Sequence, residues 1–203
     1  SMYIDDNMVV DNSVDVVYNG TSASVFVAGN VARYVNASVT GAHVVLLQSA
    51  DLADEITYTL RGASTDGSLY MDGSLKATFV LDGLTLNNPD SAAINIRDGK
   101  RIAVLLADNT ESTLSDGAGG TQKACFAVKG HTEFNGAGTL NIRGNANHAF
   151  WGKEYVQLKA GFGTLNILSA VGDGINCNQY YQQNGGKVTI SGVGDDGIQA
   201  SYE

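Results

Sequence analysis

The sequence predicts an all-β chain that forms a right-handed parallel β-helix (solenoid) with an irregular N-terminal β cap. The main observation is a phrase that occurs three times, as GAGTLNIRG, GFGTLNILS and GGKVTISGV at residues 136–144, 161–169 and 185–193. A second phrase alternates with it, as HAFWGK, DGINCN and DGIQAS at residues 148–153, 173–178 and 196–201. A repeat length of about 20 to 25 residues, with β-strands in each repeat, is typical of a β-solenoid, in which each repeat forms one coil.

Each repeat is expected to contain three strands, because a third phrase lies between the other two, as YVQLK at 155–159 and YYQQN at 180–184. Corners that contain glycine or asparagine separate these phrases. The chain has 25 glycines and a single proline, which is typical of an all-β protein with many tight corners. No segment shows a convincing helical period over the length of a helix.

Length and charge limit the possible functions. The 203 residues suit one solenoid with a capping segment. The net charge of −9 argues against nucleic acid or an anionic membrane surface as the main partner. No apolar run reaches the length of a membrane span, so membrane insertion is not expected.

Residues 1–74 are expected to form the N-terminal β cap and the irregular first coils. They contain alternating pieces such as VDVVYNG and ASVFVAG without a clean repeat. Turn signals such as Asn19-Gly20 separate these pieces. A solenoid needs a cap because an open end would present unpaired strand edges.

Residues 75–203 are expected to form the regular parallel β-helix. KATFVLDGLTLNN at 76–88 begins this part, and a Gly-rich insertion, AGGTQ, interrupts it at 118–122. The sequence ends at Glu203, just after a strand phrase and without a capping pattern. We therefore expect the C-terminal end of the β-helix to be truncated or open.

The alternation within each phrase predicts which side chains point into the core, because successive strand residues face opposite sides. In GTLNI, Leu and Ile point inward, and Thr and Asn point outward. Stacking of the coils at about 4.8 Å then produces apolar columns. One column contains Leu140, Leu165 and Val188, and another contains Ile94, Phe126, Phe150, Ile175 and Ile198.

The outward positions of the second phrase form two columns on one face. The first contains Asn95, Ala127, Trp151, Asn176 and Gln199, and the second contains Arg97, Lys129, Lys153, Asn178 and Ser201. An indole offers an apolar plane to a pyranose ring, and amides match its hydroxyl groups. Cations suit the carboxylates of uronic acids.

These columns predict a saccharide-binding face that contains Trp151, Asn176, Gln199, Arg97, Lys129 and Lys153. Alternatively, this face is only solvated, and its cations pair with Glu133 or Glu154.

An acidic cluster is predicted where VGDGI and VGDDGI place Asp173 and Asp196 in adjacent coils, with Asp195 beside them. Like charges stacked on neighbouring strands repel. A Ca²⁺ ion relieves this repulsion, because it binds several carboxylate oxygens in loose geometry. Alternatively, the Asp-Gly pairs only build the corners. Weaker candidates of the same kind are Asp98, Asp108 and Asp116.

The phrases GTLNI, GDGINCNQ, GGKVTI and GDDGIQA, preceded by SAAINI and LADNTESTLSDG, resemble bacterial carbohydrate-binding domain-containing surface proteins over about residues 75–203. The resemblance implies a calcium-binding parallel β-helix that binds pectin-type or cellulosic polysaccharides, such as polygalacturonate, without cleaving them. It also implies an extracellular or cell-surface location, and Ca²⁺ at Asp173, Asp195 and Asp196. The same fold resembles that of pectate-type polysaccharide lyases.

Three functional hypotheses follow. The preferred one is a non-catalytic carbohydrate-binding or adhesion module for acidic polysaccharide, with calcium at the acidic corners. The second is a calcium-dependent pectate-type lyase, in which Lys129 or Lys153 abstracts the proton α to a carboxylate. The third is a structural or adhesive surface β-helix that binds a protein partner.

Overall fold

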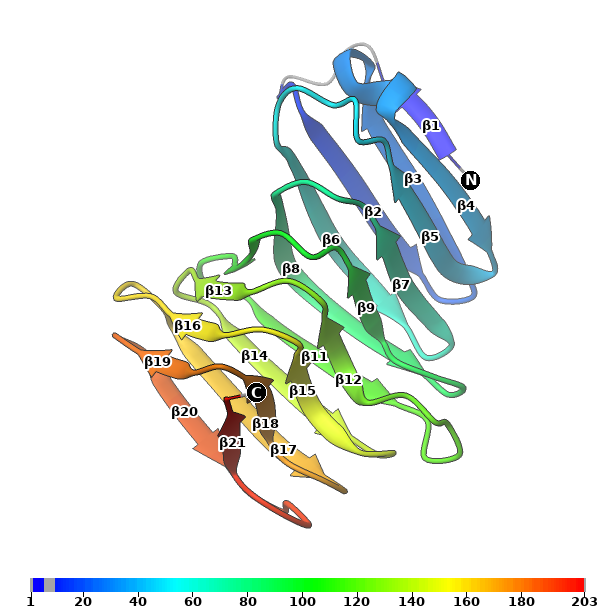
Figure 1. The fold of residues 1–203 in the computed structure, drawn as a ribbon. Coiled ribbons are helices and arrows are strands. Elements are labelled where there is room, and N and C mark those ends of the chain that lie inside the picture. The colour runs from blue at the N-terminus through cyan, green and yellow to red at the C-terminus, as the bar shows by residue number, and fades with distance from the viewer. Residues whose placement is uncertain (1, 6–9, 203) are drawn as a thin grey trace.

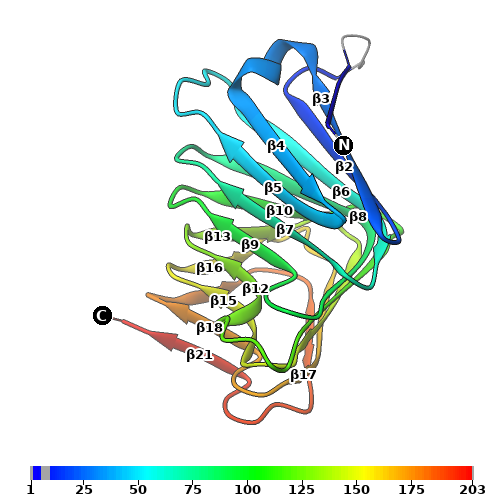
Figure 2. The same cartoon turned by 90° about the vertical axis from the view of Figure 1, so that its right-hand side faces the viewer.

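The computed structural model of the chain describes residues 2–5 and 10–202. It confirms the predicted parallel β-helix, because strands of successive coils pair in parallel along the length of the molecule. Figures 1 and 2 show the coils stacked one upon another, with the two termini at opposite ends of the stack. No helix among the described residues is long and apolar enough to cross a membrane.

Three faces surround the core, and their strands are as follows. The first face contains β4 (Val35–Thr40), β5 (Ala42–Gln48), β7 (Gly67–Asp72), β9 (Ile94–Arg97), β12 (Ala124–Val128), β15 (His148–Gly152), β18 (Ile175–Asn178) and β21 (Ile198–Ser201). The second contains β1 (Met2–Asp5), β3 (Ser22–Ala28), β2 (Ser13–Asn19), β6 (Ile56–Ser64), β8 (Ala77–Asn88), β10 (Ile102–Leu106), β13 (Thr132–Asn135), β16 (Val156–Leu158) and β19 (Tyr181–Gln183). The third contains β11 (Glu111–Asp116), β14 (Thr139–Gly144), β17 (Thr164–Ala170) and β20 (Lys187–Ile190), which continue from the end of β8.

The early coils look irregular in sequence because two of their strands are fused into one. The long strand β8 pairs with β10 through Ala77–Leu81 and with β11 through Thr85–Asn88. A turn at residues 107–110 separates β10 from β11, and from there each coil has three strands. The parallel pairing of β6 with β8 and of β7 with β9 runs across residue 75 without a break.

The N-terminal end is closed by two antiparallel hairpins. One joins β2 to β3 through the turn at Asn19-Gly20, and the other joins β4 to β5 through Gly41. A 3-10 helix, η1 (Gly29–Tyr34), connects β3 to β4 and was not expected from the sequence. The division of the chain into 1–74 and 75–203 stays a prediction. Its limits at residues 1 and 203, and residues 6–9, lie outside the described residues.

The predicted core columns are confirmed by the strand register. Leu140 pairs with Leu165, which pairs with Val188, and Phe126 pairs with Phe150 on the next coil. Most column residues are fully buried, but Ile198 is 40% exposed because it lies in the last coil that the structure describes. Stacking of apolar side chains between coils removes them from water, and this burial is the main stabilising contribution.

Candidate functional site

Trp151 lies on the outer side of β15, on the first face. The register aligns it with Ala127 on β12 and with Asn176 on β18, and Asn176 in turn pairs with Gln199. Its neighbour Phe150 is only 1% exposed, whereas Trp151 is half-buried. The two residues therefore face opposite sides of the strand, as the alternation predicts.

A groove of about 560 Å³ runs beside Trp151 on this face. Its lining residues are Ala92, Asn95, Arg97, Thr121, Gln122, Lys123, Ala127, Lys129, Trp151, Lys153 and Asn178. The volume lies within the range of small-ligand sites. Four of the six residues predicted for the saccharide face therefore lie together, namely Arg97, Lys129, Trp151 and Lys153. Asn176 and Gln199 extend the same outward column but do not line the groove.

One wall of the groove is the Gly-rich loop at residues 117–123, between β11 and β12. Its shape is held by Gln122, whose Nε2 donates to Asp116 Oδ2 at 2.7 Å and to the Gly117 carbonyl at 3.2 Å. A Cβ at Gly120 would lie 1.9 Å from Oε1 of Gln122 and 2.9 Å from the backbone carbonyl oxygen of Asp90, so a larger residue there would shift Gln122 and the loop.

Lys123 lies at the end of this loop, and the sequence did not predict it as a site residue. Its ammonium lies 4.5 Å from the centre of the Trp151 ring, which is the geometry of a cation–π contact. The residue stands outside the strand phrases, so the column analysis could not align it. The signal that could have identified it is the length of the insertion before β12. Residues 117–123 form this loop, whereas residues 145–147 alone connect β14 to β15 in the following coil.

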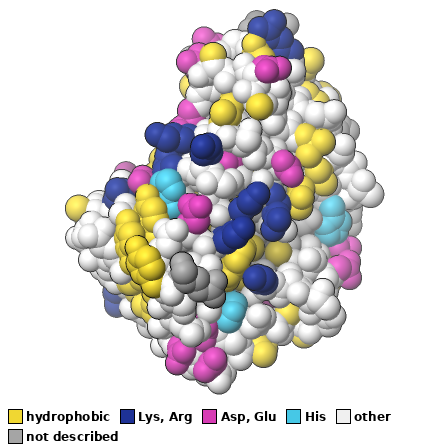
Figure 3. Space-filling view, viewed as in Figure 1, with side chains coloured by type: hydrophobic (Ala, Val, Ile, Leu, Met, Phe, Trp, Pro, Cys, Tyr) yellow, Lys and Arg dark blue, Asp and Glu magenta, His cyan; other side chains and the backbone are white. Residues whose placement is uncertain are grey.

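The groove is a cationic region on an acidic protein. It gathers four of the twelve lysines and arginines, and Figure 3 shows these dark-blue side chains around apolar ones on the first face. Among the described residues, none of the four takes part in an ion pair. Oε1 of Glu133 lies 3.6 Å from Nζ of Lys159, and Oε2 of Glu154 lies 3.6 Å from Nδ1 of His131. Neither acid therefore neutralises a cation of the groove.

The predicted acidic corner also forms. Carboxylate oxygens of Asp173, Asp195 and Asp196 lie within 4.8 Å of one another. Asp173 is 1% exposed, and the other two are exposed. Oδ1 of Asp173 accepts the backbone N–H of Asp196 at 2.8 Å, and Oδ2 accepts the side-chain amide of Asn176 at 2.7 Å.

His148 lies beside this corner but does not neutralise it. The backbone N–H of Asp173 donates to Nδ1 of His148 at 2.8 Å, so that nitrogen carries no proton. Burial lowers the pKa of His148, although the nearby carboxylates of Asp173 and Asp195 act in the opposite direction. The lowered pKa keeps the ring neutral at pH 7. Three close carboxylates without a cationic partner among the described residues are a donor set that fits Ca²⁺.

The weaker acidic candidates are dispersed. Asp98 and Asp116 are buried, and Asp108 accepts the backbone N–H of Ala137 at 3.2 Å. Asp98 Oδ1 accepts the backbone N–H of Lys100. Asp116 accepts the backbone N–H of Asn145 at Oδ1 and the side-chain amide of Gln122 at Oδ2. Each therefore supports a corner of the backbone by accepting N–H groups.

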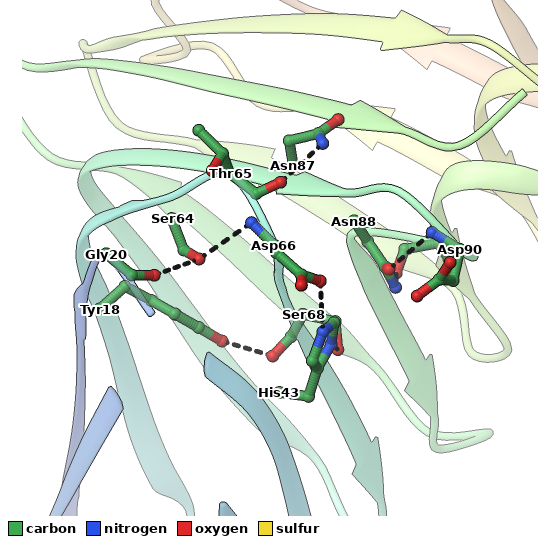
Figure 4. A network of polar contacts seen from close by, with 11 residues as sticks. Tyr18, Gly20, His43, Ser64, Thr65, Asp66, Ser68, Asn87, Asn88 and Asp90 are labelled. Atoms are coloured by element: carbon green, nitrogen blue, oxygen red, sulfur yellow. Dashed lines mark hydrogen bonds and ion pairs between the residues drawn. The ribbon is translucent and has the colours of Figure 1, made fainter. Parts of the chain in front are cut away.

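A second polar network lies near the N-terminal end (Figure 4), where His43 bonds to Ser68 Oγ at 2.7 Å and to Asp66 Oδ1 at 2.8 Å. The trio differs from that of a serine hydrolase in two respects. The carboxylate faces Nε2 and the hydroxyl faces Nδ1, and the Asp66 side chain is 64% exposed. Its bonds instead join His43 of β5 to Ser68 of β7 and to Asp66 in the corner before β7.

Known proteins with similar sequences or folds are the following. The family described as carbohydrate-binding domain-containing protein matches residues 48–203. A protein of Acetivibrio thermocellus with that description is 27% identical over 128 residues, which are 58% of this chain and 41% of that protein. The chain thus spans about two fifths of the length of this relative. A solved structure described as the gadolinium derivative of the polysaccharide lyase-like protein from C. thermocellum has a TM-score of 0.64 at 17% identity. The match covers 96% of this chain and 97% of that one, and it shows a shared fold.

Proposed function

The chain belongs to the family of carbohydrate-binding domain-containing proteins, and from this premise we propose that it binds acidic polysaccharide in the groove beside Trp151 without cleaving it. The site would lie outside the cell, where such polymers occur. Ca²⁺ at Asp173, Asp195 and Asp196 is part of the proposal.

The observation that carries the proposal is the combination of an indole with four cations that have no ion-pair partner among the described residues. Trp151 supplies the apolar surface on which the C–H face of a pyranose packs. Arg97, Lys123, Lys129 and Lys153 surround it and supply hydrogen bonds to carboxylates. A polymer of uronic acids presents both features along one chain.

Elimination chemistry is the alternative, and the composition of the groove supports binding instead. A calcium-dependent lyase needs a basic residue beside a metal-bound substrate carboxylate. Among the described residues, no acidic side chain lines the groove, so the groove itself offers no carboxylate ligand for calcium beside Lys129 and Lys153. The acidic corner is joined to the outward column through Asn176, beyond the residues that line the groove.

Ca²⁺ bound at the acidic corner would neutralise the repulsion among the three carboxylates and so stabilise the last coils. Asp173 would keep its two hydrogen bonds while the exposed Asp195 and Asp196 supply further oxygens. Neutralisation there would also reduce the repulsion between an acidic protein and an anionic polymer.

Affinity electrophoresis tests the proposal with gels that contain polygalacturonate, its methyl ester or a cellulosic glucan, each with calcium or with chelator. We expect strong retardation by polygalacturonate, weak retardation by the methyl ester, and no release of unsaturated oligosaccharides. Equal mobility in every gel would contradict the proposed function.

A further inference from the structure

Lys123 covers the ring of Trp151, and this position has a consequence for ligand choice. We propose that Lys123 is a specificity-determining residue, a displaceable cap that makes the groove select saccharides with a carboxylate over neutral ones. The inference rests on the proposed function and goes beyond it, because it assigns the selectivity to one residue and one contact.

The ammonium of Lys123 lies over the indole ring of Trp151. It lies 4.5 Å from the centre of the Trp151 ring, and the side chain is exposed. A cation over an indole is held by the electron-rich face of the ring. A sugar that packs on that face must therefore displace the ammonium.

A neutral sugar and an acidic sugar that displace the ammonium leave it in different surroundings. A neutral sugar gives the displaced ammonium no partner, so the lost cation–π contact counts against binding. A uronate residue places a carboxylate beside the ring, and the displaced ammonium then forms a charge-assisted hydrogen bond with it. Lys123 has no ion pair with any other described residue, so none of the described carboxylates competes with the ligand for its ammonium.

The backbone that carries Lys123 is fixed by hydrogen bonds on both sides. The loop is fixed by the hydrogen bonds of Gln122 to Asp116 and to Gly117. The carbonyl of Lys123 itself accepts the N–H of His148 on the next coil at 3.1 Å. The backbone is therefore held in place on both sides, and only the flexible side chain needs to move.

The test compares Lys123→Met, which keeps an unbranched apolar stem, with Lys123→Arg, which keeps the charge. Lys129→Met serves as the matched control, because it removes a groove cation that is not stacked on the ring. Isothermal titration calorimetry measures binding of an oligogalacturonide and of a neutral gluco-oligosaccharide of equal length to each protein.

We expect Lys123→Met to bind the oligogalacturonide about tenfold more weakly and the neutral oligosaccharide about two- to fivefold more tightly. Lys129→Met should weaken only the acidic ligand, and Lys123→Arg should retain the wild-type preference. The emission of Trp151, the only tryptophan of the chain, should also change in Lys123→Met without any ligand.

The outcomes separate this inference from the proposed function. Binding by the wild type with an unchanged acidic-to-neutral ratio in Lys123→Met would overturn the inference alone. Equal losses for both ligands would overturn it as well, because they would show a merely structural role. A wild type that binds neither ligand would overturn the proposed function and the inference with it.

Discussion

The side-chain amide of Asn176 donates a 2.7 Å hydrogen bond to Oδ2 of Asp173. The same amide lies 3.2 Å from Oε1 of Gln199, so its donors are engaged within the protein. Asn176 therefore connects the acidic corner to the outward column that contains Trp151. The corner has a structural function through this bond, which is separate from any function in binding metal.

This separation gives a prediction for two aspartates of the corner. Asp173→Asn should destabilise the protein by about 1–3 kcal/mol even in chelator, because an amide would direct a donor at the N–H of Asp196 or at Asn176. Asp195→Asn should leave the stability in chelator unchanged or slightly raised, because that side chain is exposed and its loss relieves repulsion among the carboxylates, and it should weaken Ca²⁺ binding. Urea unfolding in chelator and calorimetric titration with CaCl₂ measure the two effects. Equal stabilities of both variants in chelator would contradict the account.

Adjacent residues of β15 should respond oppositely to truncation. Phe150→Ala should cost about 3–5 kcal/mol of unfolding free energy, because Phe150 is a fully buried core residue. Trp151→Ala should cost a small fraction of that and should weaken glycan binding by about 1–3 kcal/mol, as for the loss of one aromatic anchor. Thermal unfolding with affinity electrophoresis distinguishes the two. A core-like loss of stability in Trp151→Ala would show that the register is off by one residue.

The burial of the Asp98 carboxyl group predicts that the stability of the protein depends on pH. Burial raises the pKa of this group, against the opposing effect of the backbone N–H groups of Lys100 and Leu75, and Asp72 adds a smaller contribution that also raises it. The folded state therefore holds this proton more tightly than the unfolded state. Its contribution to stability is present below the unfolded pKa and is lost as the pH rises through the folded pKa.

Asp98→Asn cannot ionise and should not lose this contribution. The melting temperature of the variant relative to the wild type should therefore rise between pH 4 and pH 8. Differential scanning calorimetry across this range measures the difference. Parallel curves for the two proteins would show that Asp98 is not an ionising group of the native core.

The lysines of the groove should act through charge and not as bases. Lys153→Ala and Lys129→Ala should each weaken binding to polygalacturonate at low salt, and the difference from the wild type should shrink as salt screens it. Ultraviolet absorbance of the reaction mixture with Ca²⁺ follows any unsaturated product. A steady rise with the wild type that Lys153→Ala abolishes would favour the lyase hypothesis instead.

The sequence predicts the core and the outward columns because a repeat and a period of two together determine the register. This is why Phe150 and Trp151 could be assigned to opposite sides of one strand. Lys123 could not be assigned, because the loop at 117–123 has no equivalent of the same length in the next coil. The limits of the groove were not predictable either, because a column gives a line of residues and not the wall that encloses it. Asn176 and Gln199 therefore belong to the column but not to the groove.

The sequence repeat also could not predict that strands are fused in the early coils. The strand β6 continues through a register shift at Arg61/Gly62, where Gly62 has a φ of +90°. A Cβ at Gly62 would lie 2.0 Å from the carbonyl oxygen of Tyr18 on the neighbouring strand. Such a close approach of two backbones follows from tertiary packing, which no local pattern reveals.

Fluorescence titration of Trp151 with an oligogalacturonide tests the central claim most directly, because this is the only tryptophan in the chain. We predict a saturable change of emission, with a dissociation constant equal to that from calorimetry and with weaker binding at high salt. Trp151→Ala should show much weaker binding by calorimetry. Calorimetric binding without any change of Trp151 emission, and with Trp151→Ala as tight as the wild type, would place the polysaccharide elsewhere and contradict the account.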